Sequence, residues 1–316
     1  MRESILCVGE LLIDFFCNEI NVDLKEGSIF IKKAGGAPAN VCAAVAKLGG
    51  KARFLGKVGN DPFGLFLEST LNSIGVCTDL LLKDNHAPTT LAFVSLQEDG
   101  QRDFVFNRGA DANLTMDEIP LAALTSVNIV HFGSATALLT QPFQQTYKNL
   151  MAYAKNHNHY ITFDPNYRTD LWGDNVELFK KHVFDCIPYC DFIKVSEEEL
   201  YVLTNEPTIG KAVLILHSFG VESIAVTLGK VGTFFSLKGQ TTIVPSISIQ
   251  AIDSTGAGDA FVGATLYQLD KLENPKLLTI MDWTDIIQFS NKVGAIACEK
   301  IGAIESLPTL DEVLSR

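Results

Sequence analysis

Short apolar segments alternate along the chain with longer segments in which apolar positions recur at helical spacing. The runs SILCVG at 4–9 and ARFLGKVG at 52–59 end in glycine and precede helical segments at 37–48 and 62–74. The same alternation returns further on, where the strand-like runs NIVHFG, YITFD, DFIKV and SIAVTLG flank helical segments at 140–156, 174–184 and 197–203. This order is typical of βαβ units, so the sequence predicts an α/β fold with a doubly wound, mostly parallel sheet flanked by helices.

Two segments, 14–33 and 89–106, do not follow this alternation. In the second, the turn signal Glu98-Asp99-Gly100 separates two runs rich in β-forming residues, and both segments predict hairpins. Hairpins that no helix covers form either an edge of the main sheet or a small β-flap over the strand ends. Either arrangement would place them at the border of the main sheet.

The composition excludes several classes of function. The 316 residues include 25 Lys and Arg against 37 Asp and Glu, and a net charge of −12 argues against binding to nucleic acid or to an acidic membrane surface. The seven cysteines contain no CxxC pair, which fits a reducing cytoplasm. Glu10 and Asp14 interrupt the apolar N-terminus, so neither a membrane span nor a targeting segment is predicted. Without a linker or a repeat, the sequence predicts a single cytoplasmic domain over 1–316.

The strongest chemical signal is DSTGAGDAF at 253–261, a polar turn with two glycines that leads into an amphipathic helix. Unpaired N–H groups at a helix start, the helix dipole and the bare backbone at Gly256 and Gly258 together favour a bound anion. Asp259 in the first helical turn could accept a proton from an alcohol that attacks a bound phosphorus, although it could equally be a helix cap. The chain has no GxxxxGK[ST], HRD or DFG motif, which disfavours a P-loop enzyme or a protein kinase.

A second glycine-rich segment, GGAPAN at 35–40, also precedes a predicted helix. Asn40 can both donate and accept hydrogen bonds, and Asp14 near the first strand offers an acceptor-only carboxylate. A neutral polyol needs this combination of groups. Without further information, capping for Asn40 and a solvated loop charge for Asp14 explain these residues about as well.

GGAPAN and DSTGAGDAF together resemble the two signatures of the ribokinase-like, or PfkB, carbohydrate kinases. The resemblance extends through nearly the whole chain and is greatest to the fructokinase branch, in the segments KVGNDPFG, FNRGADANL, FDPNYRTDLW, KVSEEEL, VTLGKVG and GAIESLP. It implies a ribokinase-like fold in which the two hairpins form a small lid. The implied activity is transfer of the ATP γ-phosphoryl group to a primary sugar hydroxyl, with D-fructose as substrate and Mg²⁺ as cofactor, and relatives form homodimers through the β-flap.

The resemblance also assigns roles to particular residues. The catalytic base and the anion hole correspond to Asp259, Gly256, Ala257 and Gly258. The sugar-binding positions are Asp14, Gly35, Gly36 and Asn40, to which we add the guanidinium groups of Arg108 and Arg168. The nucleotide-binding positions are Lys194, Ser196, Thr227, Gly229, Gly232 and Asn291. Glu199 matches the acid of an NxxE motif that holds magnesium through water, whereas the Asn of that motif is Ser196 here. A potassium site is implied at Asp253, Thr255 and Ser306, with backbone oxygens near Ala297, Lys300 and Gly302.

Four alternatives stay open at this point. The two arginines could instead clamp a carboxylate, which would indicate 2-keto-3-deoxygluconate kinase, and ribokinase is a further sugar kinase to consider. A non-catalytic regulator of the same fold is possible in principle, but the intact Asp259 argues against it. A Rossmann dehydrogenase is disfavoured because the glycine-rich turn lies near the C-terminus and not after the first strand.

Overall fold

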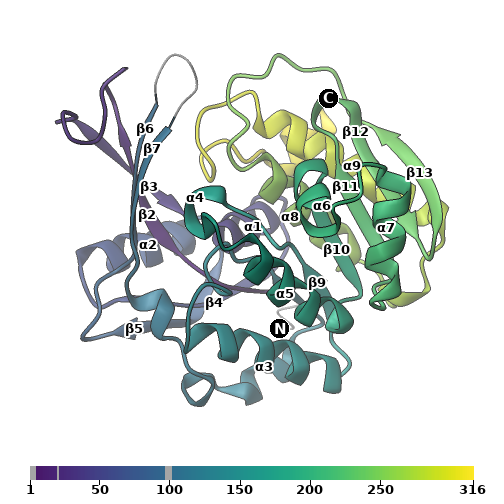
Figure 1. Cartoon of the computed structure of the whole chain (residues 1–316), viewed down its shortest axis with the longest axis horizontal. Helices are drawn as coiled ribbons and strands as arrows, with labels where there is room; N and C mark the ends of the chain where they lie inside the picture. The colour runs from purple at the N-terminus through teal and green to yellow at the C-terminus, as the bar shows by residue number, and fades with distance from the viewer. Residues whose placement is uncertain (1–4, 20, 97–101) are drawn as a thin grey trace.

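A nine-stranded sheet forms the centre of the computed structural model, which describes residues 5–19, 21–96 and 102–316 (Figure 1). The strand order is β13-β12-β11-β10-β9-β8-β1-β4-β5. Its strands are β1 (Ile5–Val8), β4 (Ala52–Gly59), β5 (Cys77–Asp84), β8 (Ile129–Phe132), β9 (Tyr160–Phe163), β10 (Phe192–Ser196), β11 (Ser223–Thr227), β12 (Gly232–Leu237) and β13 (Gln240–Pro245). The strands from β11 through β5 in this order pair in parallel, whereas β12 pairs antiparallel with both β11 and β13 at the edge.

Helices cover both faces of this sheet, which confirms the doubly wound α/β prediction. One face packs on α1 (Ala37–Lys47), α2 (Pro62–Ser73), α8 (Ala257–Leu269), α9 (Ile280–Ala297) and α10 (Leu310–Leu314). The other packs on α3 (Phe143–Asn156), α4 (Thr169–Trp172), α5 (Val176–Cys186), α6 (Glu197–Thr204) and α7 (Ile209–Ser218). Because each face buries a separate apolar cluster, the parallel strands are apolar on both sides, as their unbroken hydrophobic runs predicted.

The two segments predicted to be hairpins form a separate four-stranded sheet with the order β3-β2-β6-β7. It consists of β2 (Leu12–Cys17), β3 (Phe30–Gly35), β6 (Leu91–Leu96) and β7 (Arg102–Asn107). Each hairpin is antiparallel, and the two join through a parallel pairing of β2 with β6. This small sheet projects from the body of the molecule in Figure 1. The predicted turn at Glu98-Asp99-Gly100 lies outside the described residues.

Candidate active site

Polar residues follow the carboxyl ends of the parallel strands, which all lie along the same edge of the large sheet. Glu10 comes after β1, Ser134 after β8 and Asp164 after β9, while Ser196 and Thr227 end β10 and β11. Open parallel sheets bind ligands at this edge. Helix α8 begins nearby, because Gly258 in its first turn lies against Lys194 of β10.

The start of α8 depends on two glycines. Gly256 is the N-cap with a φ of 76°, and a Cβ there would stand 3.1 Å from the backbone of Ala303. No side chain caps the helix, so the Gly258 amide has no side-chain acceptor from the cap, while the Ala257 amide donates to the Ser254 carbonyl at 3.2 Å. A Cβ on Gly258 would lie 3.2 Å from the Lys194 ammonium. The turn therefore brings backbone donors, the positive end of a helix dipole and a lysine together, as an anion site requires.

Asp259 is the third residue of α8 and is only 8% exposed. Asn40 of α1 donates a hydrogen bond from Nδ2 to Asp259 Oδ2 at 2.8 Å, and Asn40 Oδ1 is buried with no partner within the part of the chain that the structure describes. Burial raises the pKa of Asp259 to about 6, although the Asn40 hydrogen bond and the charge of Arg168 oppose that rise. Asp259 is thus a mostly ionised base at neutral pH, and the neighbouring Asn40 retains an acceptor for a hydroxyl donor.

Lys194 supplies a buried positive charge next to this carboxylate. Its Nζ pairs with Asp164 Oδ2 at 3.0 Å, and its side chain is 9% exposed. Burial alone would lower the pKa of Lys194, but the charges of Asp164, Glu199 and Asp259 raise it above the usual range. The ammonium therefore stays charged beside the amides of α8.

Asp14 lies within β2 of the small sheet, and not in a loop after the first strand. A Cβ on Gly35 would clash with Asp14 Oδ2 at 1.9 Å, so glycine at that position makes room for the carboxylate. Burial raises the pKa of Asp14 to about 7, while Arg168 lowers it. Gly36 has a φ of 109° and is the N-cap of α1. Arg168 is exposed at the N-cap of α4 and acts electrostatically on both Asp14 and Asp259.

Glu199 and Ser196 organise the start of α6. The Ser196 hydroxyl accepts a hydrogen bond from the Glu199 amide, and Glu199 Oε2 accepts one from the Ser196 amide at 2.7 Å, which makes a capping box. Glu199 Oε1 accepts a third from the Tyr167 amide at 2.7 Å. Serine at 196 is therefore well suited to the helix cap, and Glu199 links α6 to the loop that carries Arg168.

Of the predicted nucleotide-binding residues, Lys194 and Ser196 lie on β10, and the others lie further along the same edge, around β11 and β12. Thr227 ends β11, and Gly229 and Gly232 flank a short turn with φ of 56° and 116° before β12 begins. Asn291 of α9 accepts a hydrogen bond from Thr233 at 2.6 Å and donates to the Val244 carbonyl at 2.9 Å. Both sides of its amide thus make protein contacts, which tie the β12–β13 hairpin to α9.

The residues assigned to a potassium site lie on two loops that contact each other. Asp253 accepts hydrogen bonds from the Thr255 amide and hydroxyl, and from the Gly302 amide at 2.9 Å. Although burial alone would raise the pKa of Asp253, these hydrogen bonds lower it below its ordinary value. Ser306 donates to the Ala303 carbonyl at 2.8 Å. These loops flank the start of α8 through the contact of Gly256 with Ala303.

Arg108 follows β7 and binds Asp111 and Thr140, two residues that the sequence analysis did not select. Glu10 also stands out only in the structure, as a carboxylate that is 1% exposed and accepts the Ala37 amide at the start of α1. A lone acid inside the apolar N-terminal run was the one signal that could have identified it. Among the described residues, no cluster of three metal-ligating side chains occurs, and none of the helices is long and apolar enough to span a membrane.

Comparison with known proteins gives a consistent result over the whole chain. The model of the pfkB family carbohydrate kinases matches residues 2–310. Fructokinase-1 of Zea mays is 39% identical over 99% of this chain and 97% of its own length. A fructokinase structure from Xylella fastidiosa with bound ATP has a TM-score of 0.90 and 31% identity, covering 100% of this chain and 98% of that one.

A fructokinase double mutant from Vibrio cholerae O395, solved with fructose, ADP and potassium, has a TM-score of 0.86 and 31% identity over 99% of this chain and 98% of that one. The likeness thus covers the glycine-rich segments, both sheets and the full length of the relatives. This chain belongs to the pfkB family of carbohydrate kinases and is an ATP-dependent kinase of the fructokinase-like kind.

Proposed function

We propose that this protein transfers the γ-phosphoryl group of ATP to the primary hydroxyl of D-fructose, giving fructose 6-phosphate. The observation that carries the proposal is the buried Asp259, which lies in the first turn of α8 beside a cluster of backbone donors and next to Lys194. The similarity to fructokinases over the full chain supports fructose as the sugar. The solved relative that contains fructose and ADP supports the same pairing of substrates.

Asp259 acts as the general base in this proposal. It accepts the proton of the sugar hydroxyl as the oxygen attacks phosphorus, and the Asn40 hydrogen bond keeps its carboxylate in position. The amides of Gly256, Ala257, Gly258 and Asp259, together with Lys194, stabilise the charge on the transferred oxygens. Asp14, Gly35, Gly36, Asn40, Arg108 and Arg168 hold the sugar, and the nucleotide lies along Ser196, Thr227, Gly229, Gly232 and Asn291.

The carboxylates near Lys194 fit a hydrated magnesium ion. Asp164 and Glu199 offer oxygen donors, and Mg²⁺ commonly keeps several waters while it contacts one or two carboxylates and the substrate phosphates. Glu199 uses both its oxygens on backbone amides, so it would contact the ion through water and not directly. The ion would neutralise phosphate charge during transfer.

A monovalent cation fits the loops beside α8. Asp253 Oδ1 and Oδ2 and the hydroxyls of Thr255 and Ser306 supply oxygen donors there, and the potassium in the Vibrio cholerae relative supports this choice of ion. A positive charge at this place would strengthen the potential at the amides of α8. Potassium would therefore activate the enzyme without taking part in the chemistry.

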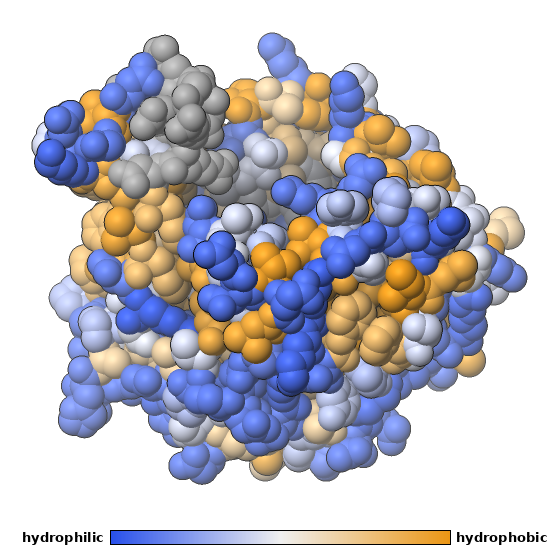
Figure 2. Space-filling view, in the orientation of Figure 1, coloured by the Kyte–Doolittle hydropathy of each residue, from blue (hydrophilic) through white to orange (hydrophobic). Residues whose placement is uncertain are grey.

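The small sheet serves as a lid in our proposal. Asp14 belongs to it, so the lid contributes directly to the sugar site. The exposed apolar side chain of Ile31 on this sheet also suits a homodimer contact through the flap, and the space-filling view shows apolar surface over the same sheet (Figure 2). Gel filtration with light scattering tests the dimer.

A substrate panel tests the function. We expect ADP release with D-fructose to exceed that with 2-keto-3-deoxygluconate or ribose, and the product to carry phosphate on the primary hydroxyl. Preference for 2-keto-3-deoxygluconate would assign the protein to that kinase branch. A folded protein that binds ATP but releases no ADP with any sugar would indicate a regulator.

A further inference from the structure

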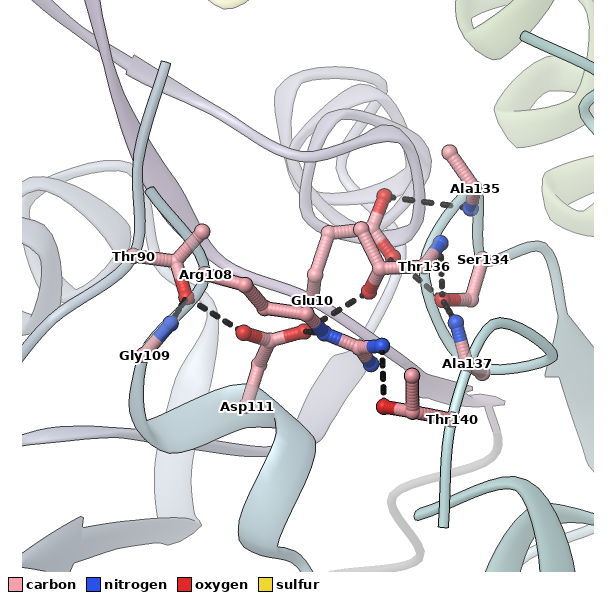
Figure 3. A network of polar contacts seen from close by, with 10 residues as sticks. All are labelled: Glu10, Thr90, Arg108, Gly109, Asp111, Ser134, Ala135, Thr136, Ala137 and Thr140. Carbon is pink, nitrogen blue, oxygen red and sulfur yellow. Dashed lines mark hydrogen bonds and ion pairs between the residues drawn. The ribbon is translucent and has the colours of Figure 1, made fainter. Parts of the chain in front are cut away.

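A buried network of polar side chains connects the two sheets (Figure 3). It contains two carboxylates that are each 1% exposed, Glu10 after β1 and Asp111 in the short helix η1 (Ala110–Asn113). The Thr136 hydroxyl lies between them, 2.8 Å from Asp111 Oδ2 and 3.4 Å from Glu10 Oε2. The proposed function assigns no role to either carboxylate, but Arg108, which it places on the sugar side, is part of the network.

Arg108 uses most of its guanidinium group on protein partners. Its Nε donates to Asp111 Oδ2 at 3.1 Å, and its Nη1 donates to the Thr140 hydroxyl at 2.8 Å. Its Nη2 is buried and has no hydrogen-bond partner among the described residues. Buried donors are almost always paired, so the unpaired Nη2 indicates an acceptor oxygen supplied by a ligand or by water.

Asp111 is held firmly as the partner of this arginine. Thr90 donates its hydroxyl hydrogen to Asp111 Oδ1, and the Gly109 amide in turn donates to the Thr90 oxygen at 2.8 Å. Thr136 fixes Oδ2, the oxygen that also accepts from Arg108. The ion pair is therefore buried and fixed in orientation, and the charge of Asp111 cancels that of Arg108.

Apart from Arg108, the network drawn in Figure 3 contains acids and no second cation, and burial raises the pKa of Glu10 above its ordinary value. Glu10 accepts hydrogen bonds from the Ala37 and Ala135 amides, and its carboxylate acts electrostatically on Asp14 of the sugar site. Arg168, the other arginine on this side, faces Asp14 and Asp259. A substrate carboxylate placed beside Arg108 would thus meet Asp111 and no surplus positive charge from that arginine, and like charges in such a site oppose binding.

We propose that Asp111 is a specificity-determining residue of the sugar site. By neutralising Arg108, it leaves this arginine as a hydrogen-bond donor for a neutral hydroxyl and removes the positive charge that Arg108 would otherwise offer to a sugar acid. The site therefore accepts a neutral ketohexose and rejects 2-keto-3-deoxygluconate. The inference rests on the proposed function, which places Arg108 beside the sugar.

The variant Asp111→Asn tests this inference, because it keeps the shape of the side chain and removes its charge. We expect kcat/KM for 2-keto-3-deoxygluconate, relative to that for D-fructose, to rise about tenfold or more. The matched control is Asp79→Asn, which removes an acid from the Arg53–Asp79 ion pair between β4 and β5. The control should leave the ratio unchanged. A purely structural role for Asp111 would lower both activities together.

The double variant Arg108→Gln with Asp111→Asn supplies an independent arm, since it removes both charges of the Arg108–Asp111 ion pair. Its ratio should return to within about twofold of the wild-type value. If the kcat/KM for 2-keto-3-deoxygluconate relative to that for D-fructose fell about tenfold below the wild-type value, Arg108 would bind the substrate carboxylate in the wild type. That result would overturn the inference. The double variant also decides the question if Asp111→Asn alone does not fold.

The outcomes separate this inference from the proposed function. A wild-type enzyme that does not phosphorylate fructose contradicts the proposed function. Calorimetric binding of 2-keto-3-deoxygluconate and fructose to the wild type and Asp111→Asn then still tests the charge argument, which requires the variant to gain affinity for the acid. An enzyme that phosphorylates fructose but keeps its ratio in Asp111→Asn contradicts the inference alone.

Discussion

At the scale of single residues, two buried carboxyl groups at the candidate site have different environments. Burial raises the pKa of Asp14 to about 7 and that of Asp259 to about 6. Asp259 has the lower value because Asn40 donates to it and Arg168 and Lys194 offset its charge. Groups whose surroundings separate their pKa values commonly divide the acid and base roles between them. Asp259 is thus the better base near pH 7, and Asp14 suits sugar binding.

The variant Asp259→Asn should lower kcat by a factor of about 10²–10⁴, because it removes the proton acceptor and keeps the hydrogen bond from Asn40. Fructose binding should persist, and calorimetry can measure it beside steady-state kinetics. Asp282→Asn is the matched control. Asp282 is also the third residue of its helix, α9, but it is exposed and only accepts a hydrogen bond from the N-cap residue Thr279. Near-normal turnover in Asp259→Asn would exclude Asp259 as the base.

The pH dependence follows from the same two groups. Asp259 must lose its proton to act as a base, so kcat/KM should fall as the pH drops through about 6, with Asp14 extending the fall upward to about 7. Activity should level off above that range. An initial-rate series from pH 5 to 8 measures the profile, and Asp14→Asn should remove its upper part. A profile that is flat across this range would contradict both assignments.

At the scale of elements, the start of α8 shows how one helix terminus serves binding and not stability. Gly258 is the second residue of α8, where alanine would favour the helix by about 1 kcal/mol. The glycine instead leaves room for Lys194, whose Nζ would lie 3.2 Å from an added Cβ. The weak helix former Gly258 therefore allows the Lys194 ammonium to lie next to the amides of α8.

The variant Gly258→Ala should consequently separate stability from activity. We expect its Tm to stay the same or rise, while kcat falls by about tenfold to a hundredfold as the lysine and the phosphoryl group move apart. Differential scanning calorimetry and steady-state kinetics measure the two effects. Gly210→Ala is the matched control, because Gly210 is the second residue of α7 and an added Cβ there meets nothing within 4 Å. Equal activity in both variants would count against the anion site.

The elements themselves were largely predictable from the sequence. The amphipathic helix predicted after the glycine-rich turn of DSTGAGDAF matches α8, and the parallel strands coincide with apolar runs because burial on both faces demands them. Helix α7 and the β12–β13 hairpin were not predicted. Neighbouring runs in that region, such as VTLGKVGTFFSL, change from a buried parallel strand to an antiparallel edge without a marked change in composition.

The site was predictable only in part. Asn40 and Asp259 are hydrogen-bonded although 219 positions separate them. The resemblance to a family assigned both residues to one site, which periodicity could not do. Asp111 and Glu10 escaped the prediction because a single acid in an apolar or mixed run has no local pattern. Their importance depends on burial and on partners such as Thr136 that are distant in the sequence.

At the scale of the whole molecule, the small sheet has two faces with different tasks. Directly paired residues of neighbouring strands share a face, so Phe16 lies in one row with Ile31 and Val94, on the face that also carries Asp14. The opposite face carries Phe15, which packs edge-on against Phe63 of α2 at 5.7 Å. One face therefore anchors the sheet to the body, and the other turns toward the sugar site.

Variants on the two faces of the small sheet test whether it acts as a lid. Phe16→Ser should weaken the apolar cover over the site, so that water competes with the sugar as phosphoryl acceptor. We expect a higher KM for fructose and more ADP than sugar phosphate, which a coupled ADP assay and product quantification measure together. Val105→Ser on the opposite face is the control, because Val105 pairs with Phe93 in the row of Phe15. If Phe16→Ser still gives one sugar phosphate for each ADP at an unchanged KM, the small sheet does not act as a lid. Its role would then be limited to carrying Asp14 into the sugar site.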